Sequence, residues 1–138
     1  MTASWGGLGT LWNKPVVTCY VRPQRYTREF LDKEEYFTVS FYEDTFRPAL
    51  ATCGRTSGRD TDKAEATGLD PVFTEAAPFF RQAQLVFVCK KIYRGEIDPA
   101  GFIDPTIEEN YYNKDYHYIY IGEVVKVLEK KYEKKYED

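Results

Sequence analysis

The sequence Leu85-Val86-Phe87-Val88-Cys89 is apolar at every position and continues into Lys90-Lys91-Ile92-Tyr93. An unbroken apolar run of this length is typical of a β-strand that is covered on both of its faces. Alternating or extended apolar patterns predict three more strands, Val16–Arg22, Tyr36–Tyr42 and Tyr116 to about Leu128. Gly122 interrupts the last of them, which predicts a bulge or the close approach of another part of the chain.

Short helices are expected between the strands, over Gln24–Lys33, from Thr45 as the N-cap to Gly54 as the stop signal, and over Asp60–Gly68. None is long enough to cover a parallel sheet, so the pattern favours a closed or nearly closed β-barrel over alternating β-α units. Residues 98–113 are expected to form a long surface loop, and loops of that length are often functional. Lys126–Asp138 is expected to be a strand end that frays into a solvated tail.

The composition indicates a globular protein with one domain, residues 1–138. Hydrophobic residues make up 43% of the chain and charged residues 30%, which excludes disordered and fibrous classes. The net charge of −3 argues against a nucleic-acid partner, because phosphate binding needs a basic excess on one face. Aromatic residues make up 17%, which fits either a pocket or interface built on flat rings or simply a β-rich core.

The sequence also bears on compartment and metals. No apolar run approaches the roughly 20 residues that cross a bilayer, so we expect no membrane partner and a cytoplasmic location. Cys19, Cys53 and Cys89 are odd in number and far apart, and His117 is the single histidine. We therefore expect no disulfide framework and no metal site.

The segment Arg22-Pro23-Gln24-Arg25-Tyr26-Thr27 lies where a predicted strand runs into a predicted helix. A helix start offers free backbone N–H groups and the positive end of the helix dipole, and two guanidinium groups and hydroxyls accompany it here. The segment suits a phosphate or another anion. The alternative is an ordinary surface turn with Arg25 and Arg28 solvated.

The segment from Cys53 to Lys63 combines two glycines, several hydroxyls and three basic residues ahead of a helix start. Such a loop can wrap an anion with backbone amides, although it does not match the phosphate-binding Gly-Lys-Ser/Thr pattern. A loop with a turn glycine and no ligand is the alternative.

Two further features are candidates for a ligand site. Thr2-Ala3-Ser4-Trp5-Gly6-Gly7 places small polar residues around one large ring, which would let a planar ligand lie against the backbone. His117 is the candidate for proton transfer near neutral pH, but it shares a strand face with Ile119 and Ile121 and is equally well explained as a core histidine. The sequence contains no nucleophile elbow and gives no support to hydrolase chemistry.

Four blocks together resemble the flavin reductase-like, FMN-binding split-barrel family. They are Thr2–Gly7 with Trp12-Asn13-Lys14-Pro15, then Arg22–Thr27, then Ser57-Gly58-Arg59-Asp60 with Lys63, and finally Tyr116–Val124. The resemblance implies a mainly β fold, a split β-barrel with short connecting helices, in a homodimer that binds FMN near its interface. Family members usually carry a further segment ahead of the position of Met1, so we expect this chain to lack the family's N-terminal segment.

The resemblance also implies roles for particular residues. Thr2, Ala3, Ser4 and Trp5 would line the flavin ring and ribityl chain, Arg22, Tyr26 and Thr27 would hold the phosphate, and Ser57, Gly58 and Lys63 would close the site. Lys63 would add positive charge that stabilises reduced flavin. Reductase members often place Asp directly before the histidine, whereas Tyr116 separates Asp115 from His117 here.

The function that the resemblance implies is an FMN-dependent oxidoreductase. Electrons would pass from NAD(P)H or a reduced partner protein through FMN to an acceptor. The alternatives are a flavin-binding electron carrier or storage protein without turnover of NAD(P)H, and a non-catalytic binding module of the same fold.

Overall fold

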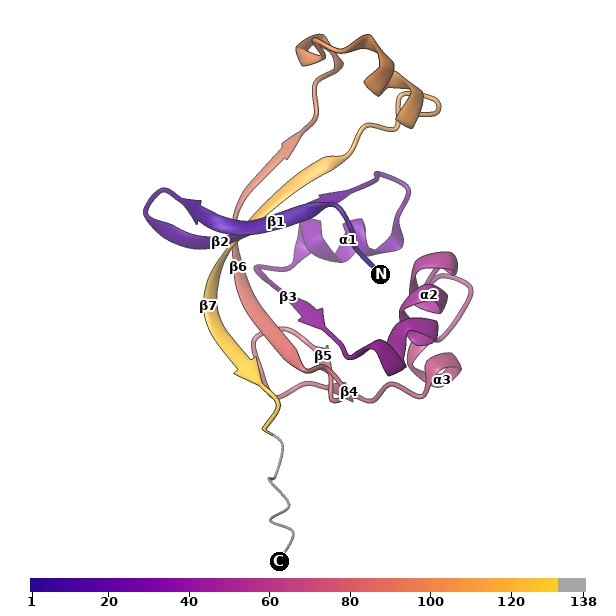
Figure 1. Cartoon of the computed structure of the whole chain (residues 1–138), viewed down its shortest axis with the longest axis vertical. Helices are drawn as coiled ribbons and strands as arrows, with labels where there is room; N and C mark the ends of the chain where they lie inside the picture. Colours follow the sequence, from indigo (N-terminus) through magenta and orange to yellow (C-terminus); the bar gives the residue numbers. More distant parts are fainter. Residues whose placement is uncertain (132–138) are drawn as a thin grey trace, which may run out of the picture.

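The computed structural model describes residues 1–131 as a mainly β protein with short helices (Figure 1). Its strands are β1 (Gly6–Leu11), β2 (Lys14–Val21), β3 (Tyr36–Phe41), β4 (Pro71–Val72), β5 (Phe79–Phe80), β6 (Leu85–Glu96) and β7 (Tyr118–Glu129). Its helices are α1 (Tyr26–Lys33), α2 (Arg47–Arg55) and α3 (Lys63–Thr67), with single 3-10 segments η1 (Asp44–Phe46), η2 (Pro99–Gly101) and η3 (Pro105–Asn110). Of the predicted tail, Lys126–Glu129 belongs to β7, and residues 132–138 lie outside the described residues.

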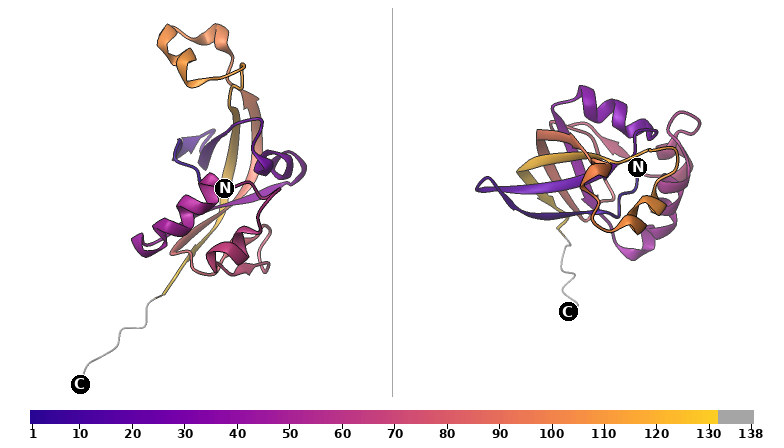
Figure 2. Two further views of the ribbon diagram at one scale, coloured as in Figure 1. Left: turned by 90° about the vertical axis from the view of Figure 1, so that its right-hand side faces the viewer. Right: turned by 90° about the horizontal axis from the view of Figure 1, so that it is seen from above.

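Strands β1, β2, β7, β6 and β3 form one antiparallel sheet in that order. Strands β6 and β7 are the longest and cross the whole molecule as a hairpin (Figure 1). The connection between them, residues 97–117, extends beyond the rest of the fold and carries η2 and η3 (Figures 1 and 2). The four strands expected from the apolar patterns are thus confirmed as β2, β3, β6 and β7, whereas β1 and the two-residue strands β4 and β5 were not predicted.

Within the described residues the sheet is open, with β1 and β3 at its two edges. The expectation of a mainly β fold with short connecting helices is confirmed, and the closed or nearly closed barrel is not. Closure needs the edge strands to pair with each other or with further strands. In residues 1–131 β1 pairs with β2 and β3 pairs with β6, and each leaves its other side without a strand partner.

The helices begin and end near the predicted positions, with two corrections. Thr45 is not the N-cap of α2: it lies inside η1, and α2 begins at Arg47 because Pro48 suits the first helical turn. Gly54 is not a stop, since the helix ends only where Thr56 turns to an extended conformation. In α3, by contrast, Asp62 caps the start by accepting from the Glu65 N–H, and Gly68 ends the helix with a left-handed φ of 73°.

The core lies on both sides of the β6–β7 hairpin. Val86 and Val88 of β6 pack with Ala83, and Tyr42, Phe79 and Leu128 cover this cluster. Further buried side chains come from β2, β6 and β7, namely Val17, Val21, Cys89, Tyr120 and Ile121. Among the described residues, no helix is both long and apolar enough to span a bilayer. The start of the chain lies between α1 and α2 in Figure 1, and the Thr2 hydroxyl donates to the Leu50 carbonyl of α2.

Candidate functional site

A cleft of about 880 Å³ lies between the start of α1 and the loop that joins α2 to α3. Its lining residues are Met1, Arg22, Gln24–Thr27, Phe30 and Arg55–Lys63. The two segments that the sequence singled out for anion binding thus face each other across one space. Pairing two loops from different parts of the chain gives the cleft polar groups on both walls.

The first wall is the junction of β2 with α1. The chain turns after β2 through a hydrogen bond from the Arg25 N–H to the Arg22 carbonyl, at 3.1 Å. The first turn of a helix leaves N–H groups without intrahelical partners. Arg25, the N-cap of α1, supplies no capping hydrogen bond from its side chain within the described residues. The start of α1 therefore presents backbone donors and the Thr27 hydroxyl to the cleft.

The second wall is the loop from Arg55 to Lys63, which folds around Ser57. The Ser57 carbonyl accepts from the N–H groups of Asp60 and Thr61, and the Ser57 hydroxyl accepts from the Arg59 N–H. Gly58 packs against Tyr26, because a Cβ added there would lie 3.1 Å from Cδ2 of the ring. A Cβ at this position would require the Tyr26 ring to shift by a few tenths of an ångström.

Cationic side chains outnumber carboxylates in the cleft. Its lining contains five cationic residues, Arg22, Arg25, Arg55, Arg59 and Lys63, and two acidic ones, Asp60 and Asp62. Lys63 Nζ donates to the Cys53 carbonyl at 2.9 Å, and Arg25 Nη1 donates to the Gly54 carbonyl at 3.1 Å. Both cations are thereby anchored at the end of α2. An anion entering the cleft would meet positive charge whose position is already set.

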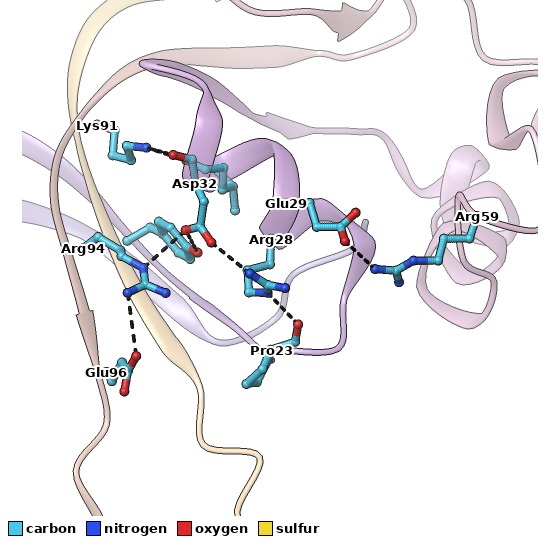
Figure 3. A network of polar contacts seen from close by, with 10 residues as sticks. Pro23, Arg28, Glu29, Asp32, Arg59, Lys91, Arg94 and Glu96 are labelled. Atoms are coloured by element: carbon cyan, nitrogen blue, oxygen red, sulfur yellow. Dashed lines mark hydrogen bonds and ion pairs between the residues drawn. The ribbon is translucent and has the colours of Figure 1, made fainter.

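Arg59 bridges the two walls. Its guanidinium carbon lies 4.7 Å from the centre of the Tyr26 ring, and its Nη2 lies 3.2 Å from Oε1 of Glu29 in α1 (Figure 3). Its Nη1 also donates to the Gln24 carbonyl at 3.2 Å. The Tyr26 ring meets Phe30 edge to face, with ring centres 4.8 Å apart. Flat surfaces therefore lie beside the cationic groups, which suits a ligand that is both anionic and aromatic.

The structure brings together six of the predicted ligand residues in this cleft: Arg22, Tyr26, Thr27, Ser57, Gly58 and Lys63. Arg22 is also engaged elsewhere, since its Nη1 pairs with Asp115 Oδ2 at 3.0 Å and its Nη2 donates to the Asn110 carbonyl. A hydrogen bond from Gln24 lowers the pKa of Asp115, and Arg22 lowers it further. Arg22 thus connects the cleft to the β6–β7 connection.

The remaining predicted residues, Thr2 to Trp5, lie outside the cleft lining. The Thr2 hydroxyl donates to the Leu50 carbonyl of α2, and its side chain lies next to Gly54, whose carbonyl holds Arg25. Thr2 therefore lies directly behind the cleft wall, whereas Trp5 lies against His117 with ring centres 5.3 Å apart. Their role toward a flavin ring stays a prediction.

His117 is buried in a group of aromatic rings rather than in the cleft. Trp5, Tyr20 and Tyr111 surround it, and the Tyr111 hydroxyl lies 2.8 Å from its Nδ1. Burial lowers the pKa of His117, and the charge of Arg22 lowers it further. These contacts match the core histidine that the sequence left open, and the catalytic role stays a prediction.

Of the cleft residues that were not among the predicted ligand residues, three make the contacts described above: Arg25, Phe30 and Arg59. Arg25 and Arg59 belong to the same two sequence segments, so the density of basic residues there was the available signal. Phe30 carries no such signal. It reaches the cleft because it lies one helical turn beyond Tyr26.

Comparisons with solved structures show similar folds. A flavoredoxin from Methanosarcina acetivorans superposes with a TM-score of 0.70 at 19% identity, covering 93% of this chain and 59% of that one. An FMN-binding protein from Thermus thermophilus gives 0.70 at 22% identity, with 93% and 62% covered. The nitrilotriacetate monooxygenase component B of Bacillus cereus gives 0.73 at 17% identity, with 96% and 63% covered.

The chain spans about three fifths of the length of these structures. No curated protein matches its sequence significantly. The sequence does match the flavin reductase like domain over residues 1–136, almost its whole length. The chain therefore belongs to the flavin reductase-like domain family.

Proposed function

We propose that the chain binds FMN in the cleft between α1 and the loop of residues 55–63, and acts as an FMN-dependent oxidoreductase. The observation that carries this proposal is the convergence of cations, hydroxyls and the open start of α1 on one space. Electrons would pass from NAD(P)H or a reduced partner protein through FMN to an acceptor. When bound, FMN supplies the electron transfer, and the protein supplies binding and orientation.

The residues present fit a phosphate-bearing ligand. The Thr27 hydroxyl and the N–H groups at the start of α1 would donate to the phosphate, and Arg25 would supply charge. Gly58 leaves the opposite wall without a side chain, and a Cβ there would fill the space beside Tyr26. Lys63, anchored on the Cys53 carbonyl, would hold positive charge near the ligand.

The names of similar structures support a flavin role and leave the kind of role open. Two solved structures are of an FMN-binding protein from Thermus thermophilus, and two are of flavoredoxins. The flavoredoxins favour a second candidate function, an electron carrier that exchanges electrons with a protein and does not turn over NAD(P)H. The two candidates share the FMN site and differ in the donor.

The first experiment is an absorbance spectrum of the full chain after incubation with FMN and removal of free flavin. We expect retained flavin bands, and we expect Thr27→Ala and Lys63→Ala to weaken FMN binding. Thr10→Ala on the exposed strand β1 and Lys33→Ala at the far end of α1 are the matched controls. A colourless wild type, or an unchanged affinity for FMN in both cleft variants, would contradict the assignment of the FMN site to this cleft.

The donor is tested by anaerobic mixing of the FMN-loaded chain with NADH and with NADPH. Bleaching of the flavin by either nucleotide supports a reductase. Reduction of the flavin only by a protein donor supports an electron carrier. If the chain binds no flavin at all, the remaining candidate function is a non-catalytic binding module.

We also propose that the chain is a homodimer. An apolar groove of about 400 Å³ runs across β1, β2, β6 and β7. Three apolar side chains that line it, those of Leu8, Val125 and Val127, are each about half exposed. Exposed apolar patches of this kind are typical of interfaces. A second copy on this face would cover side chains that are otherwise in water.

We propose a cytoplasmic location, because Cys19, Cys53 and Cys89 are odd in number and far apart in the sequence, unlike a disulfide framework. All of them lie in the described residues and form no disulfide there. Burial raises the pKa of Cys19 to about 11 and that of Cys89 to about 12, which keeps these thiols protonated and unreactive.

A further inference from the structure

The polar network at the far end of α1 connects this helix to the centre of the sheet (Figure 3). Asp32, in the last turn of α1, accepts a hydrogen bond from the Tyr120 hydroxyl at 2.6 Å through Oδ1. The Nε of Arg94 on β6 lies 3.3 Å from the same oxygen, and Arg28 Nη1 lies 3.0 Å from Oδ2. One carboxylate thus joins β7, β6 and its own helix.

Tyr120 gives this network a fixed base. It is 0% exposed, and its backbone pairs with Cys19 of β2 on one side and Arg94 of β6 on the other. Its hydroxyl is the polar end of an otherwise buried side chain. Burial raises the pKa of Tyr120 to about 12, and donation to Asp32 raises it as well, so the hydroxyl keeps its proton at physiological pH.

Further contacts hold Arg94 and the C-terminal end of the helix. The Arg94 guanidinium lies 4.1 Å from the centre of the Tyr118 ring. Its Nη1 lies 3.7 Å from Oε1 of Glu96, as Figure 3 shows. Lys91 Nζ donates to the backbone carbonyls of Leu31 and Asp32. Burial acts to raise the pKa of Asp32, but the hydrogen bonds from Tyr120 and Arg28 and the charge of Arg94 outweigh it and lower the pKa.

Besides these contacts, helix α1 is held by partly buried side chains and by the contacts of Arg59 with Tyr26 and Glu29. As the structure describes it, α1 contains no fully buried residue. Most helices are fixed to their domain by burying an apolar face. Here polar contacts at one end, from Asp32 and the last carbonyls, fix the orientation of a helix whose other end forms a wall of the cleft.

We propose that Asp32, acting through Tyr120 and Arg94, is a positioning residue for the phosphate end of the cleft. This inference rests on the proposed FMN site. Asp32 does not line the cleft, so it acts by setting where the N–H groups and the Thr27 hydroxyl at the start of α1 lie. Its loss should weaken contacts to the phosphate and leave contacts to the flavin ring unchanged.

Comparison of FMN with riboflavin, which lacks the phosphate, separates positioning from general stability. We expect Asp32→Asn to raise the dissociation constant of the full chain for FMN by about 3- to 30-fold, a range typical of coupling through a contact network. The constant for riboflavin should change by less than about twofold, the scale of a distant surface substitution. Tyr120→Phe, which removes only the hydroxyl, should act in the same direction.

Glu35→Gln is the matched control. Glu35 follows α1 and pairs with Lys90 of β6 at 3.6 Å, so it is also an ion pair between this part of the chain and β6. It should leave both dissociation constants unchanged. Combining Asp32→Asn with Thr27→Ala should give less than the sum of the two single effects, because both act on the same phosphate contact.

Each outcome is informative. Equal weakening of FMN and riboflavin in Asp32→Asn would show a general loss of structure and overturn the positioning role, as would an unchanged FMN affinity in both Asp32→Asn and Tyr120→Phe. If the wild type binds FMN no better than riboflavin, the phosphate site fails and this inference fails with it. If the wild type prefers FMN and only the variants behave otherwise than expected, the proposed function stands and the positioning role alone falls. Circular dichroism of every variant confirms the fold.

Discussion

The ring of Phe37 on β3 lies against Gly122 on β7, two strands away in the sheet. A Cβ added at Gly122 would lie 2.6 Å from Cζ of Phe37 and 2.7 Å from Cβ of Cys89 on β6. The glycine therefore lets an aromatic side chain from one edge of the sheet reach the central strands. The interruption seen at Gly122 in the sequence reflects this close approach.

Gly122→Ala should destabilise the protein by about 1–3 kcal/mol, the usual cost of forcing a methyl group into a packed core. The cost arises from space alone, because Gly122 does not have a left-handed φ. Denaturant unfolding followed by circular dichroism measures it. Gly7→Ala on β1 is the control, since a Cβ there would meet nothing within 4 Å. Adding Phe37→Leu to Gly122→Ala should recover part of the loss, and a neutral Gly122→Ala would contradict the packing described here.

The stability of the protein should fall as the pH is lowered from about 7.5 to 5.5, because His117 is buried in its neutral form. Burial lowers the native pKa of His117 below its ordinary 6.5, so the unfolded chain binds more protons in this interval. The stabilisation is complete above pH 6.5 and is lost as the pH falls through the native pKa.

Urea midpoints across this pH range measure the effect, and His117→Gln should flatten the profile. Tyr111→Phe removes the hydrogen bond to Nδ1 and retains most of the burial, so it should keep a pH dependence of the same sign. A His117→Gln profile as steep as that of the wild type would assign the titration to another group.

Arg59→Gln should weaken FMN binding about tenfold, which corresponds to about 1.4 kcal/mol. The variant removes a cation that bridges both walls of the cleft and stacks on Tyr26. Its free energy of unfolding should change by less than about 0.5 kcal/mol, because the pair with Glu29 is well exposed to water. Fluorescence titration with FMN measures the affinity. Arg47→Gln, an exposed arginine outside the cleft, should bind FMN like the wild type, and equal weakening in both variants would point to net charge instead of site geometry.

Val127→Glu should convert the proposed dimer to a monomer at micromolar concentrations. Val127 lies on the apolar groove and is 51% exposed, so a second copy placed there would have to bury the new carboxylate. Sedimentation velocity distinguishes the two states. Ile103→Glu is the control, because Ile103 is 98% exposed and does not line the groove. A wild type that sediments as a monomer, or a Val127→Glu variant that stays dimeric, would exclude this face.

The strands could be predicted because their signal is local. Alternation in Tyr36–Phe41 and the apolar run at Leu85 depend only on which faces are covered, and both became strands. The start of α2 could not be predicted, because a 3-10 turn at Asp44–Phe46 precedes the helix. Thr45 has a side chain typical of an N-cap, but it lies within that turn and not at the N-cap position. Whether the sheet closes could not be predicted from local sequence patterns either, since closure depends on which strands far apart in the sequence pair with each other.

The cleft was partly predictable for the same reason. Arg22–Thr27 and Ser57–Lys63 each carry a local signal, and the fold brings them together. The hydrogen bond from the Tyr120 hydroxyl to Asp32 joins positions 88 residues apart, and no local sequence feature of either residue predicts this contact. Likewise, His117 differs from a solvent-facing histidine only through the rings packed around it.

The pairing of β2 with β7 constrains the order in which the strands can pair while the chain is being synthesised. Val16 on β2 pairs with Glu123 on β7, so a strand near the start of the chain has its partner near the end. During synthesis the β1–β2 hairpin can form before β7 exists, but it cannot join the sheet until β7 has left the ribosome. The β6–β7 hairpin, whose strands are neighbours in sequence order, closes a much shorter loop. Between the synthesis of β2 and that of β7, the β1–β2 hairpin therefore has no partner strand in the sheet.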